Sequence, residues 1–298
     1  MTASFDIVAL TGKPGDPSVE DSLGALAAHL LGRSRRVLAD PSVATMLSEP
    51  RVERPSLPEL LDSAQLMIAI GGDGTMLYAT RLVAAHDIPL LGINRGRLGF
   101  LADVGPGDMI ERVDELLAGQ YAVEQRQMLV AEIENGGDPR KATALNDVVV
   151  QKRETGRMMD LETWVDGVYV NTHGGDGLVV ATPTGSTAYA LSGGGPIIYP
   201  GTDAFVLVPI CPHTLSDRPL VIPADRQIEI RLVATETTGS EVACDGQSMG
   251  LIYPGDRLRI RRARRRATLL HPADYDYFRI LRSKLGWGRG KYGRGGRG

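Results

Sequence analysis

Residues 66–79 read LMIAIGGDGTMLYA, and this stretch decides the fold of the first part of the chain. An apolar run at 66–70 ends in a glycine-rich turn, and a helical pattern follows the turn. The backbone N–H groups of such a turn and of a helix start favour an anion, so the context suits phosphate. The familiar phosphate loop adds a lysine, whereas this turn carries a carboxylate, Asp73. The sequence therefore predicts a phosphate turn that has a further chemical task.

The residues of the turn indicate what that task is. We expect Gly71, Gly72, Gly74 and Thr75 to form the phosphate turn, because glycine permits positive φ and close backbone approach. A carboxylate among anions helps by holding Mg²⁺ or by taking a proton from an attacking hydroxyl. The alternative is that Asp73 only caps the following helix. Asp73 is a catalytic residue in the first case and a structural residue in the second.

Short apolar runs alternate with helical patterns on both sides of this turn. The expected strands are 5–10, 66–70 and 89–93, and the expected helices are 19–30 and 76–85. This alternation predicts an open, parallel α/β sheet. Ligands of such sheets lie at the carboxyl ends of the strands, which is where 71–75 and 94–99 fall. We therefore assign residues 1–122 to an α/β domain that carries the GGDGT turn.

The apolar periodicity changes to two from about residue 125. Segments such as 128–133 and 161–165 are typical of strands, and Asp166–Gly167 is a two-residue hairpin signal. Residues 123–274 are therefore predicted to form an all-β, sandwich-like domain. We expect residues 275–288, which include a helical pattern, to return to the α/β domain. Residues 289–298 read as a flexible Gly/Arg tail.

The composition limits the class of protein. Of the 298 residues 43% are hydrophobic, no apolar run reaches the length of a membrane span, and two cysteines are too few for a disulfide framework. These features predict a cytoplasmic protein with no membrane partner. The net charge of −3 hides a basic end, because residues 257–298 hold twelve Arg and two Lys against two Asp. Such an end can bind nucleic acid, polyphosphate or an acidic subunit. The alternative is a solvated strand face followed by a loose tail. We expect no nucleic acid partner.

A second glycine-rich stretch, residues 176–201, reads DGLVVATPTGSTAYALSGGGPIIYPG. It offers a flat ring, Tyr189, and a set of neutral hydroxyls on Thr182, Thr184, Ser186, Thr187 and Ser192. Neutral hydroxyls, backbone N–H groups and a ring suit a nucleotide better than a bare phosphate. The alternative is a tight turn whose hydroxyls satisfy its own backbone.

Two shorter motifs add polar groups to the second half. In ALNDVVV, Asn146 and Asp147 can grip ribose hydroxyls or an adenine edge, or they mark an edge bulge. In CDGQ, residues 245–247 are a weaker candidate that also reads as a hairpin turn. No pair of histidines has metal-ligand spacing, so no protein-bound metal site is predicted. A dehydrogenase is poorly supported, because G-x-G-x-x-G with a ribose-binding acid about 20 residues later does not occur.

The order of these motifs resembles the bacterial NAD kinase family. The matching strings are GGDGT, LGINRGRLGFLAD, ALNDVVV, GDGLVVATPTGSTAYALSGGGPI, PICPHTLSDRPLV and DGQ, and the resemblance covers residue 5 to about residue 288. GGDGT alone is shared with lipid kinases and phosphofructokinases, whereas TPTGSTAY is far more specific. The resemblance implies an α/β domain, an all-β domain, and a homotetramer or homodimer. It also implies that ATP, with Mg²⁺, phosphorylates the 2′-hydroxyl of the adenosine ribose of NAD to give NADP.

The resemblance also implies roles for individual residues. Asp73 would be the general base on the 2′-hydroxyl, with Gly74 beside it, and both would contact NAD. The other residues that would bind NAD are Asn146, Asp147, Arg157, Gly174, Asp176, Thr184, Thr187, Ala188, Tyr189, Ala190, Leu191, Ser192 and Gln247. Mg²⁺ on the donor would offset the charge of Asp73, and Arg95 and Arg97 either help or are exposed surface arginines.

Gly174 stands where some members of the family carry an arginine before the Asp-Gly of GDGL. Glycine there resembles members with a looser choice of substrate, so polyphosphate would serve beside ATP, or NADH beside NAD. Two other classes stay open. A non-catalytic NAD(P) sensor would bind the dinucleotide yet ignore ATP, and a lipid or sugar kinase sharing GGDGT would need a different acceptor site.

Overall fold

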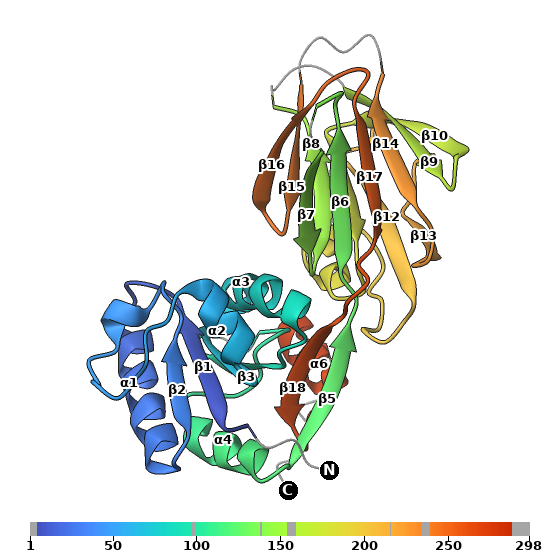
Figure 1. Ribbon diagram of the computed structural model, residues 1–298. Coiled ribbons are helices and arrows are strands. Elements are labelled where there is room, and N and C mark those ends of the chain that lie inside the picture. Colours follow the sequence, from blue (N-terminus) through green and yellow to red (C-terminus); the bar gives the residue numbers. More distant parts are fainter. Residues whose placement is uncertain are drawn as a thin grey trace, which may run out of the picture. The chain divides into compact units, whose positions relative to one another are not determined.

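The chain forms two compact units (Figure 1). The computed structural model describes residues 5–96, 99–137, 139–153, 159–214, 216–233 and 239–287. Unit 1 consists of residues 1–124 and 268–298, and unit 2 consists of residues 125–267, so unit 2 interrupts unit 1 in the sequence. Within the described ranges no helix is both long and apolar enough to span a membrane.

Unit 1 is built on a six-stranded sheet with the order β2-β1-β3-β4-β18-β5. β1 pairs in parallel with β2 and β3, β3 pairs in parallel with β4, and β4 with β18. This arrangement confirms the expected open α/β fold. The elements of unit 1 are β1 (Ile7–Gly12), α1 (Pro17–Gly32), β2 (Arg36–Ala39), η1 (Ala44–Met46), α2 (Leu57–Ser63), β3 (Leu66–Gly71), α3 (Asp73–Val83), η2 (Ala84–His86), β4 (Leu90–Asn94), α4 (Met109–Leu117), β5 (Tyr121–Arg126), β18 (Ala267–Pro272) and α6 (Tyr277–Leu285).

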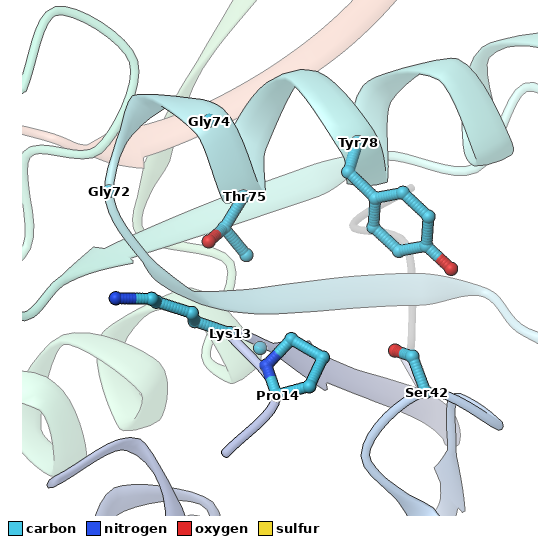
Figure 2. Close-up of a pocket in the computed structure, with 8 residues that line it drawn as sticks. Lys13, Pro14, Ser42, Gly72, Gly74, Thr75 and Tyr78 are labelled. Atoms are coloured by element: carbon cyan, nitrogen blue, oxygen red, sulfur yellow. The ribbon is translucent and has the colours of Figure 1, made fainter. Parts of the chain in front are cut away.

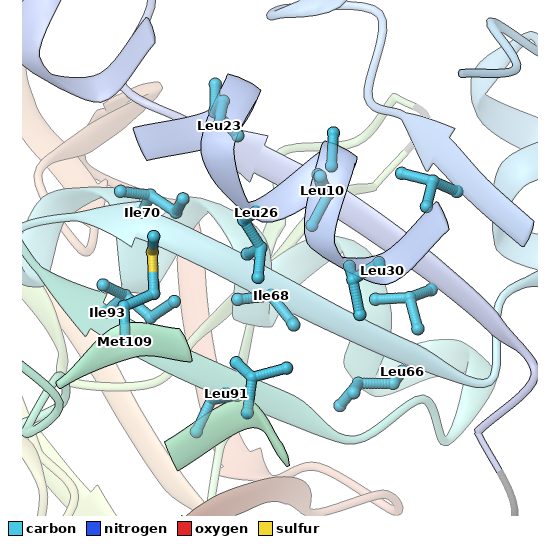
Figure 3. Packing of buried hydrophobic residues seen from close by; sticks show 14 of the residues in the cluster. Leu10, Leu23, Leu26, Leu30, Leu66, Ile68, Ile70, Leu91, Ile93 and Met109 are labelled. Carbon is cyan, nitrogen blue, oxygen red and sulfur yellow. The ribbon is translucent and has the colours of Figure 1, made fainter. Parts of the chain in front are cut away.

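Helices α1 and α4 share one hydrophobic core with the sheet (Figure 3). α1 begins at Pro17 and is capped by Asp16, whose side chain accepts a hydrogen bond from the backbone N–H of Ser18. Leu23, Leu26 and Leu30 recur at helical spacing on α1 and are fully buried. They pack with alternate strand residues and with α4, which contribute Leu10, Leu66, Ile68, Ile70, Leu91, Ile93 and Met109. Each buried leucine is worth about 1.5–3 kcal/mol, so this core fixes α1 on the sheet.

The strand order creates a switch point between β1 and β3. The chain runs from β1 to β2 on one side and then crosses to β3 on the other side of β1. Loops that leave the carboxyl ends of β1 and β3 therefore diverge, and ligands of open α/β sheets bind in the crevice that results. The segment after Gly12 and the turn after Gly71 are these two loops. The fold thus places GGDGT at the ligand-binding end of the sheet.

Unit 2 is a sandwich of two antiparallel sheets of six strands. Their orders are β10-β9-β14-β17-β6-β7 and β13-β12-β11-β8-β15-β16. This confirms the expected all-β architecture. The elements of unit 2 are β6 (Leu129–Glu134), β7 (Arg140–Ala144), β8 (Asp147–Gln151), β9 (Met159–Val165), β10 (Val168–Gly175), β11 (Gly177–Ala181), η3 (Gly185–Thr187), α5 (Tyr189–Ser192), β12 (Ala204–Ile210), β13 (Leu220–Pro223), β14 (Ile228–Leu232), β15 (Ser240–Cys244), β16 (Gln247–Ile252) and β17 (Arg257–Arg262).

The sheet that contains β11 is covered on both faces. Its inner face joins the main core of the sandwich through Leu178, Val180 and residues of the other sheet. Its outer face packs against Ala190 and Ile198, which follow η3. β11 is therefore apolar and buried along its whole length, and the glycine-rich segment that follows it is fixed to the sheet by packing.

The chain returns to unit 1 at Thr268, earlier than the residue 275 expected from the sequence. β18 pairs with β4 through Leu269 and Leu270, so it lies inside the α/β sheet. An alternating strand at the end of an all-β segment reads as one more strand of that segment. Only the pairing partner distinguishes the two units here.

A buried charge cluster holds β18 in place. His271, on β18, lies 3.1 Å from Asp103 Oδ2 and 3.2 Å from Glu124 Oε2, and its ring stacks on Tyr275 at 3.9 Å. Burial lowers the pKa of His271, but hydrogen bonds to the two carboxylates and their charges raise it, and the pKa is raised overall. The two carboxylates therefore favour the protonated imidazole.

Three of the sequence expectations lie outside the described residues. These are the help of Arg97 at the phosphate turn, the NAD contact of Arg157, and the tail at 289–298.

Candidate functional site

Asp73 is the first residue of α3 and faces the loop after β4. The helix cap is Gly72, and no side chain makes a capping hydrogen bond, so the interpretation of Asp73 as a helix cap is wrong. The carboxylate instead accepts hydrogen bonds from Phe100 N at 3.3 Å and Leu101 N at 3.2 Å. An ionised carboxylate has about four acceptor positions, so two are left for a substrate.

The glycines around Asp73 provide steric room and do not adopt an unusual backbone conformation. None of Gly71, Gly72 and Gly74 has a positive φ, so their freedom of φ is not used. A side chain at Gly99 would collide with the Asp73 carboxylate, and one at Gly71 would collide with Thr75. A Cβ at Gly72 or Gly74 would meet nothing within 4 Å. These two glycines leave the backbone of the turn open to a ligand.

A pocket of about 540 Å³ opens beside the turn, at the switch point of the sheet (Figure 2). Its lining comes from the ends of β1 and β3, from α3 and from the loop after β2, and consists of Gly12, Lys13, Pro14, Ser42, Gly72, Gly74, Thr75 and Tyr78. Figure 2 shows Lys13 extending along the glycine turn, while Ser42 and Tyr78 lie at the opposite end. The pocket therefore has a cationic end beside the glycine turn and a partly aromatic end.

Lys13 and Tyr78 set the electrostatics of this pocket. Lys13 is 67% exposed and has one distant ion pair, 3.7 Å to Asp16, so its charge is available to a ligand. Burial, followed by the charge of Asp40, raises the pKa of Tyr78, whose phenol stays neutral at physiological pH. Lys13, Ser42 and Tyr78 were not expected from the sequence. Only the turn Lys13–Pro14–Gly15 directly after a strand was available as a signal.

A second cluster forms in unit 2 around the Asn146–Asp147 pair. β8 lies between β11 and β15 in its sheet, so the interpretation of this pair as an edge bulge is wrong. The Asp245 carboxylate accepts hydrogen bonds from the backbone N–H groups of Leu145, Asn146 and Asp147 at 2.9, 2.7 and 3.3 Å. Asp245 and Gly246 have positive φ, and Cys244 pairs with Gln247, so CDGQ is a hairpin turn. This turn also fixes the Asn146–Asp147 backbone, a role that the sequence did not indicate.

Asp147 is an unusual acid. It is 5% exposed, and burial together with the charge of Asp245 raises its pKa to about 7. Asp147 can therefore carry a proton near neutral pH and donate a hydrogen bond, for example to a ribose hydroxyl.

An Asp147→Asn variant tests this protonation. The folded chain holds a proton on Asp147 up to a pH of about 7, whereas the unfolded chain releases it above a pH of about 4. The free energy of unfolding of unit 2 should therefore fall as pH rises from about 4 to 7 and then level off. Asparagine cannot ionise, so the free energy of unfolding of the variant should rise relative to that of the wild type over this window, by on the order of 2–4 kcal/mol at pH 8.

The measurement is urea unfolding at pH 5 and pH 8, followed by Trp164 fluorescence in a Trp287→Phe background. The only other tryptophan in the chain is Trp287, which lies in unit 1, so Trp164 then reports on unit 2 alone. Asp225→Asn is the control, because the Asp225 side chain is 64% exposed. A stability difference that does not widen from pH 5 to pH 8 would show that Asp147 is ionised in the fold.

The glycine-rich stretch after β11 packs directly on this cluster. Thr182 N donates to Asn146 O at 2.9 Å, and the Thr182 hydroxyl donates to Leu145 O at 2.6 Å. A side chain at Gly185 would collide with the backbone of Asn146. The stretch and the Asn146–Asp147 strand therefore form one rigid piece.

Most hydroxyls of this stretch bond within the protein. Ser186 donates to Pro183 O at 2.6 Å, and Thr187 donates to Thr184 O at 3.1 Å. Thr184, 6% exposed, accepts a hydrogen bond from the buried Arg126 at 3.1 Å. For Ser186 and Thr187 the self-satisfied turn is thus what the structure shows, whereas the Thr182 hydroxyl donates to Leu145 O outside the stretch. Composition cannot distinguish an inward hydroxyl from an outward one, and it gave no sign of Arg126.

The remaining expected residues divide into two groups. Tyr189, Ser192 and Gln247 are exposed, Asn146, Thr187, Ala188 and Leu191 are half-buried, and Ala190 is buried. Asp176 comes directly before β11 and Gly174 lies at the end of β10, whereas Asp147 pairs with Ala181 at the other end of β11, five residue steps or roughly 17 Å along the strand from Asp176. The Lys152 hydrogen bond lowers the pKa of Asp176, which therefore stays ionised. Asp176 and Gly174 therefore lie apart from the Asn146–Asp147 cluster.

These parts define a class of protein. Unit 1 has a glycine turn, a helix N-terminus and a lysine beside a pocket, which suit phosphate, and a carboxylate in the same turn, which suits a reacting hydroxyl. Unit 2 has a rigid polar cluster and an exposed ring, which suit a nucleotide. Together these features are typical of a nucleotide-dependent phosphotransferase.

Comparison with known proteins identifies the family. Residues 18–121 match the ATP-NAD kinase N-terminal domain and residues 145–271 match the ATP-NAD kinase C-terminal domain. The NAD kinase of Thiobacillus denitrificans is 46% identical over 97% of this chain and 99% of its own length. The NAD kinase of Methylococcus capsulatus is 43% identical over 96% and 99%. The chain belongs to the NAD kinase family.

Two solved structures are similar to the whole chain. Yeast NADH kinase complexed with NADH has a TM-score of 0.89 and 25% identity, covering 97% of this chain and 89% of that one. An NAD kinase from Archaeoglobus fulgidus in complex with ATP has a TM-score of 0.68 and 27% identity, covering 94% and 97%. The fold and the class of enzyme are thus those expected from the sequence.

Proposed function

We propose that this chain transfers the terminal phosphoryl group of ATP to the 2′-hydroxyl of the adenosine ribose of NAD, producing NADP. The observation that carries the proposal is Asp73, a carboxylate at the open glycine turn beside a lysine-bearing pocket. Membership of the NAD kinase family supports the choice of NAD as acceptor.

Asp73 acts on the hydroxyl in this proposal. Its two backbone hydrogen bonds orient the carboxylate, and the remaining acceptor positions take the hydroxyl proton as the new phosphorus–oxygen bond forms and the bond from the terminal phosphorus of ATP to the leaving ADP breaks. The backbone N–H groups at the start of α3 and the Lys13 ammonium hold the donor phosphates. Arg95 is a further candidate for contacting the donor phosphates. Its backbone N–H donates to Gly71 O at 3.2 Å, and the buried Nε of its side chain has no hydrogen-bond partner within the described ranges.

Kinases of this family need a divalent cation, and we propose Mg²⁺. No group of three or more His, Cys, Asp or Glu among the described residues is arranged to hold a metal ion. Mg²⁺ is usually held by one or two carboxylates, water and substrate phosphates rather than by a protein cage. The donor phosphates would carry the ion, whose charge would offset that of the Asp73 carboxylate. The ion would neutralise charge on the donor phosphates.

We propose that the Asn146–Asp147 cluster and the exposed face of α5 bind the dinucleotide. Asn146 is half-buried beside the protonatable Asp147, and Tyr189 on α5 is 41% exposed, so its ring is free to stack on a base. Thr184, Thr187, Ala188, Ala190, Leu191, Ser192 and Gln247 complete the proposed set, to which Gly74, Arg157, Gly174 and Asp176 also belong.

One assay tests the activity. Purified protein is incubated with NAD, Mg²⁺ and ATP, and NADP is detected by a coupled dehydrogenase. Product formation is expected. NAD binding without product would favour a sensor, and phosphorylation of a lipid extract in place of NAD would favour a lipid kinase.

The same assay with polyphosphate or NADH tests relaxed specificity at Gly174. A Cβ at Gly174 would lie 3.0 Å from Asp160 Oδ1, so a larger residue would alter this surface. We propose that the open surface admits a second donor or acceptor. Product from neither polyphosphate nor NADH, where ATP and NAD give product, would contradict this.

A Lys13→Gln variant tests the pocket beside the glycine turn, which we name the donor pocket because it is the proposed site of the donor phosphates. Lys13 contacts donor phosphates in the proposal, and losing one charge-assisted contact at an exposed site should raise the KM for ATP about tenfold. The KM for NAD should change little. Lys141→Gln is the control, because the Lys141 side chain is 55% exposed in unit 2. Equal changes in both KM values would remove Lys13 from the donor site.

We propose that the protein works as a homotetramer or homodimer. The edge strands β10 and β13 expose apolar side chains, with Val168 at 68% and Val221 at 48% exposure. Exposed apolar edges are normally covered, and a second copy would cover them. Light scattering coupled to size-exclusion chromatography measures the oligomer, and a monomer at micromolar concentration would contradict the proposal.

A further inference from the structure

Five arginines lie at the end of β17 and in the turn that follows it, in the sequence RRARRR at 261–266. The turn borders a cavity of about 440 Å³, within the size range of small-molecule sites. The cavity is lined by Asp225, Gln227, Arg261, Arg262, Ala263, Arg264 and Arg266. Four arginines therefore face one lining carboxylate. The proposed kinase chemistry uses none of these residues.

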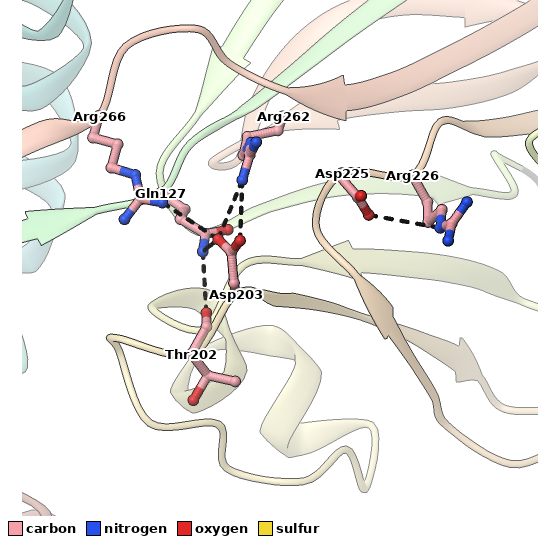
Figure 4. Close-up of polar contacts among 7 residues, drawn as sticks. All are labelled: Gln127, Thr202, Asp203, Asp225, Arg226, Arg262 and Arg266. Atoms are coloured by element: carbon pink, nitrogen blue, oxygen red, sulfur yellow. Dashed lines mark hydrogen bonds and ion pairs between the residues drawn. The ribbon is translucent and has the colours of Figure 1, made fainter.

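Arg262 and Arg266 are both held by ion pairs with Asp203 (Figure 4). Gln127 is 2% exposed and donates hydrogen bonds to Thr202 O at 3.1 Å and to Asp203 Oδ1 at 2.6 Å, which fixes the Asp203 carboxylate. That carboxylate pairs with Arg262 at 3.2 Å and with Arg266 at 3.3 Å. Each guanidinium has five donor N–H groups, so both keep donors for a ligand. A buried amide thus orders two cations at the cavity.

The other two arginines carry uncompensated charge. Arg261 makes a single long hydrogen bond, 3.5 Å to Arg262 O, and within the described part of the chain neither Arg261 nor Arg264 forms an ion pair. Asp225 faces the cavity but lies 3.6 Å from Arg226 Nε. The four guanidinium charges at this cavity outnumber the two carboxylates described beside it, Asp203 and Asp225, so the arrangement favours an anion with more than one charge.

The chemistry of the lining identifies the class of anion. Guanidinium groups match phosphate oxygens in bidentate geometry. No aromatic residue lines the cavity, so it lacks the stacking surface by which proteins bind bases. We propose that this cavity, which we name the arginine cavity, binds a compact anion with two or more linked phosphate groups and no base. It is a site separate from the pocket beside Asp73.

Tripolyphosphate is the probe that tests this site. It is titrated by isothermal calorimetry into the full chain with the donor pocket saturated by ATP, so that the donor pocket does not contribute heat. Binding should persist with ATP present and weaken as NaCl is raised, because exposed charges are screened. In an Arg261→Gln/Arg264→Gln variant, the Kd should rise at least about tenfold, since each lost charged contact removes a charge-assisted hydrogen bond.

The matched control is Arg279→Gln/Arg282→Gln, which removes two exposed arginine charges from α6 of unit 1. It should bind tripolyphosphate like the wild type. Both variants should keep NADP formation, which separates this site from the proposed function. An unchanged Kd in the arginine-cavity variant, or loss of binding under saturating ATP, would overturn the proposal. Tighter binding of an RNA oligonucleotide than of tripolyphosphate, lost in the same variant, would overturn the class of ligand.

Discussion

An Asp73→Asn variant should turn over about 10²–10⁴ times more slowly than the wild type while it still binds NAD. Asparagine has nearly the shape of aspartate, but its amide oxygen is a far weaker base than a carboxylate. A ribose hydroxyl is a poor nucleophile, so the barrier to phosphoryl transfer rises when no base takes its proton. The measurements are kcat from NADP formation and the Kd for NAD from calorimetry.

The structure adds a second effect that this experiment must separate. The Asp73 carboxylate also accepts hydrogen bonds from Phe100 N and Leu101 N, and an asparagine amide group can accept only through its single oxygen. Part of the loop order is therefore lost in the variant. If NAD affinity falls as much as kcat, Asp73 is a positioning residue. Asp108→Asn, an exposed position in unit 1 with no capping hydrogen bond, controls for the change of charge.

A Gly185→Ala variant should lose about 3 kcal/mol or more of the stability of unit 2, and most of its activity with it. The added methyl would collide with the carbonyl group of Asn146, which is backbone and cannot rotate away. The Thr182 hydrogen bonds tie the same two segments together, so the strand and the turn must separate. The clash therefore displaces the proposed NAD-binding pair directly.

Urea unfolding followed by Trp164 fluorescence, in the Trp287→Phe background, measures this loss in unit 2. Gly201→Ala is the matched control in the same unit, because its methyl would approach only Tyr199, at an ordinary 3.4 Å. Near-native stability of Gly185→Ala would mean that the Asn146 backbone has room to move. The rigid coupling of the two segments would then be wrong.

The position of Asp73 was predictable because local rules agree there. An apolar run, a glycine turn and a helical pattern follow one another within 14 residues, and each is read from neighbours in sequence. The helix α2 was missed, although Ser56 and Glu59 form a capping box and Pro58 stands in the first turn. Its single buried leucine, Leu60, gave too little apolar periodicity. Caps alone are a weaker signal than a buried face.

The pocket beside the turn was not predictable from local patterns. Lys13, Ser42 and Tyr78 come from three segments that meet only because β1 and β3 are neighbours in the sheet. The order of parallel strands depends on pairing between distant segments, which one sequence does not display. For the same reason the buried Arg126 beneath Thr184 had no signal. The sequence indicated Asp73, and the strand order was needed to find its surroundings.

The interruption of unit 1 by unit 2 governs the order in which a newly made chain can assemble. β5 is separated from β4 in the sheet by β18, and β18 is translated more than 140 residues after β5. While the ribosome is still making unit 2, β5 has no neighbour to pair with, and β4 presents an unprotected apolar edge. The sandwich, whose strands are contiguous in sequence, can complete its pairing first. Because synthesis runs from the N-terminus, the sheet of unit 1, which carries Asp73, can be completed only after β18 has been made.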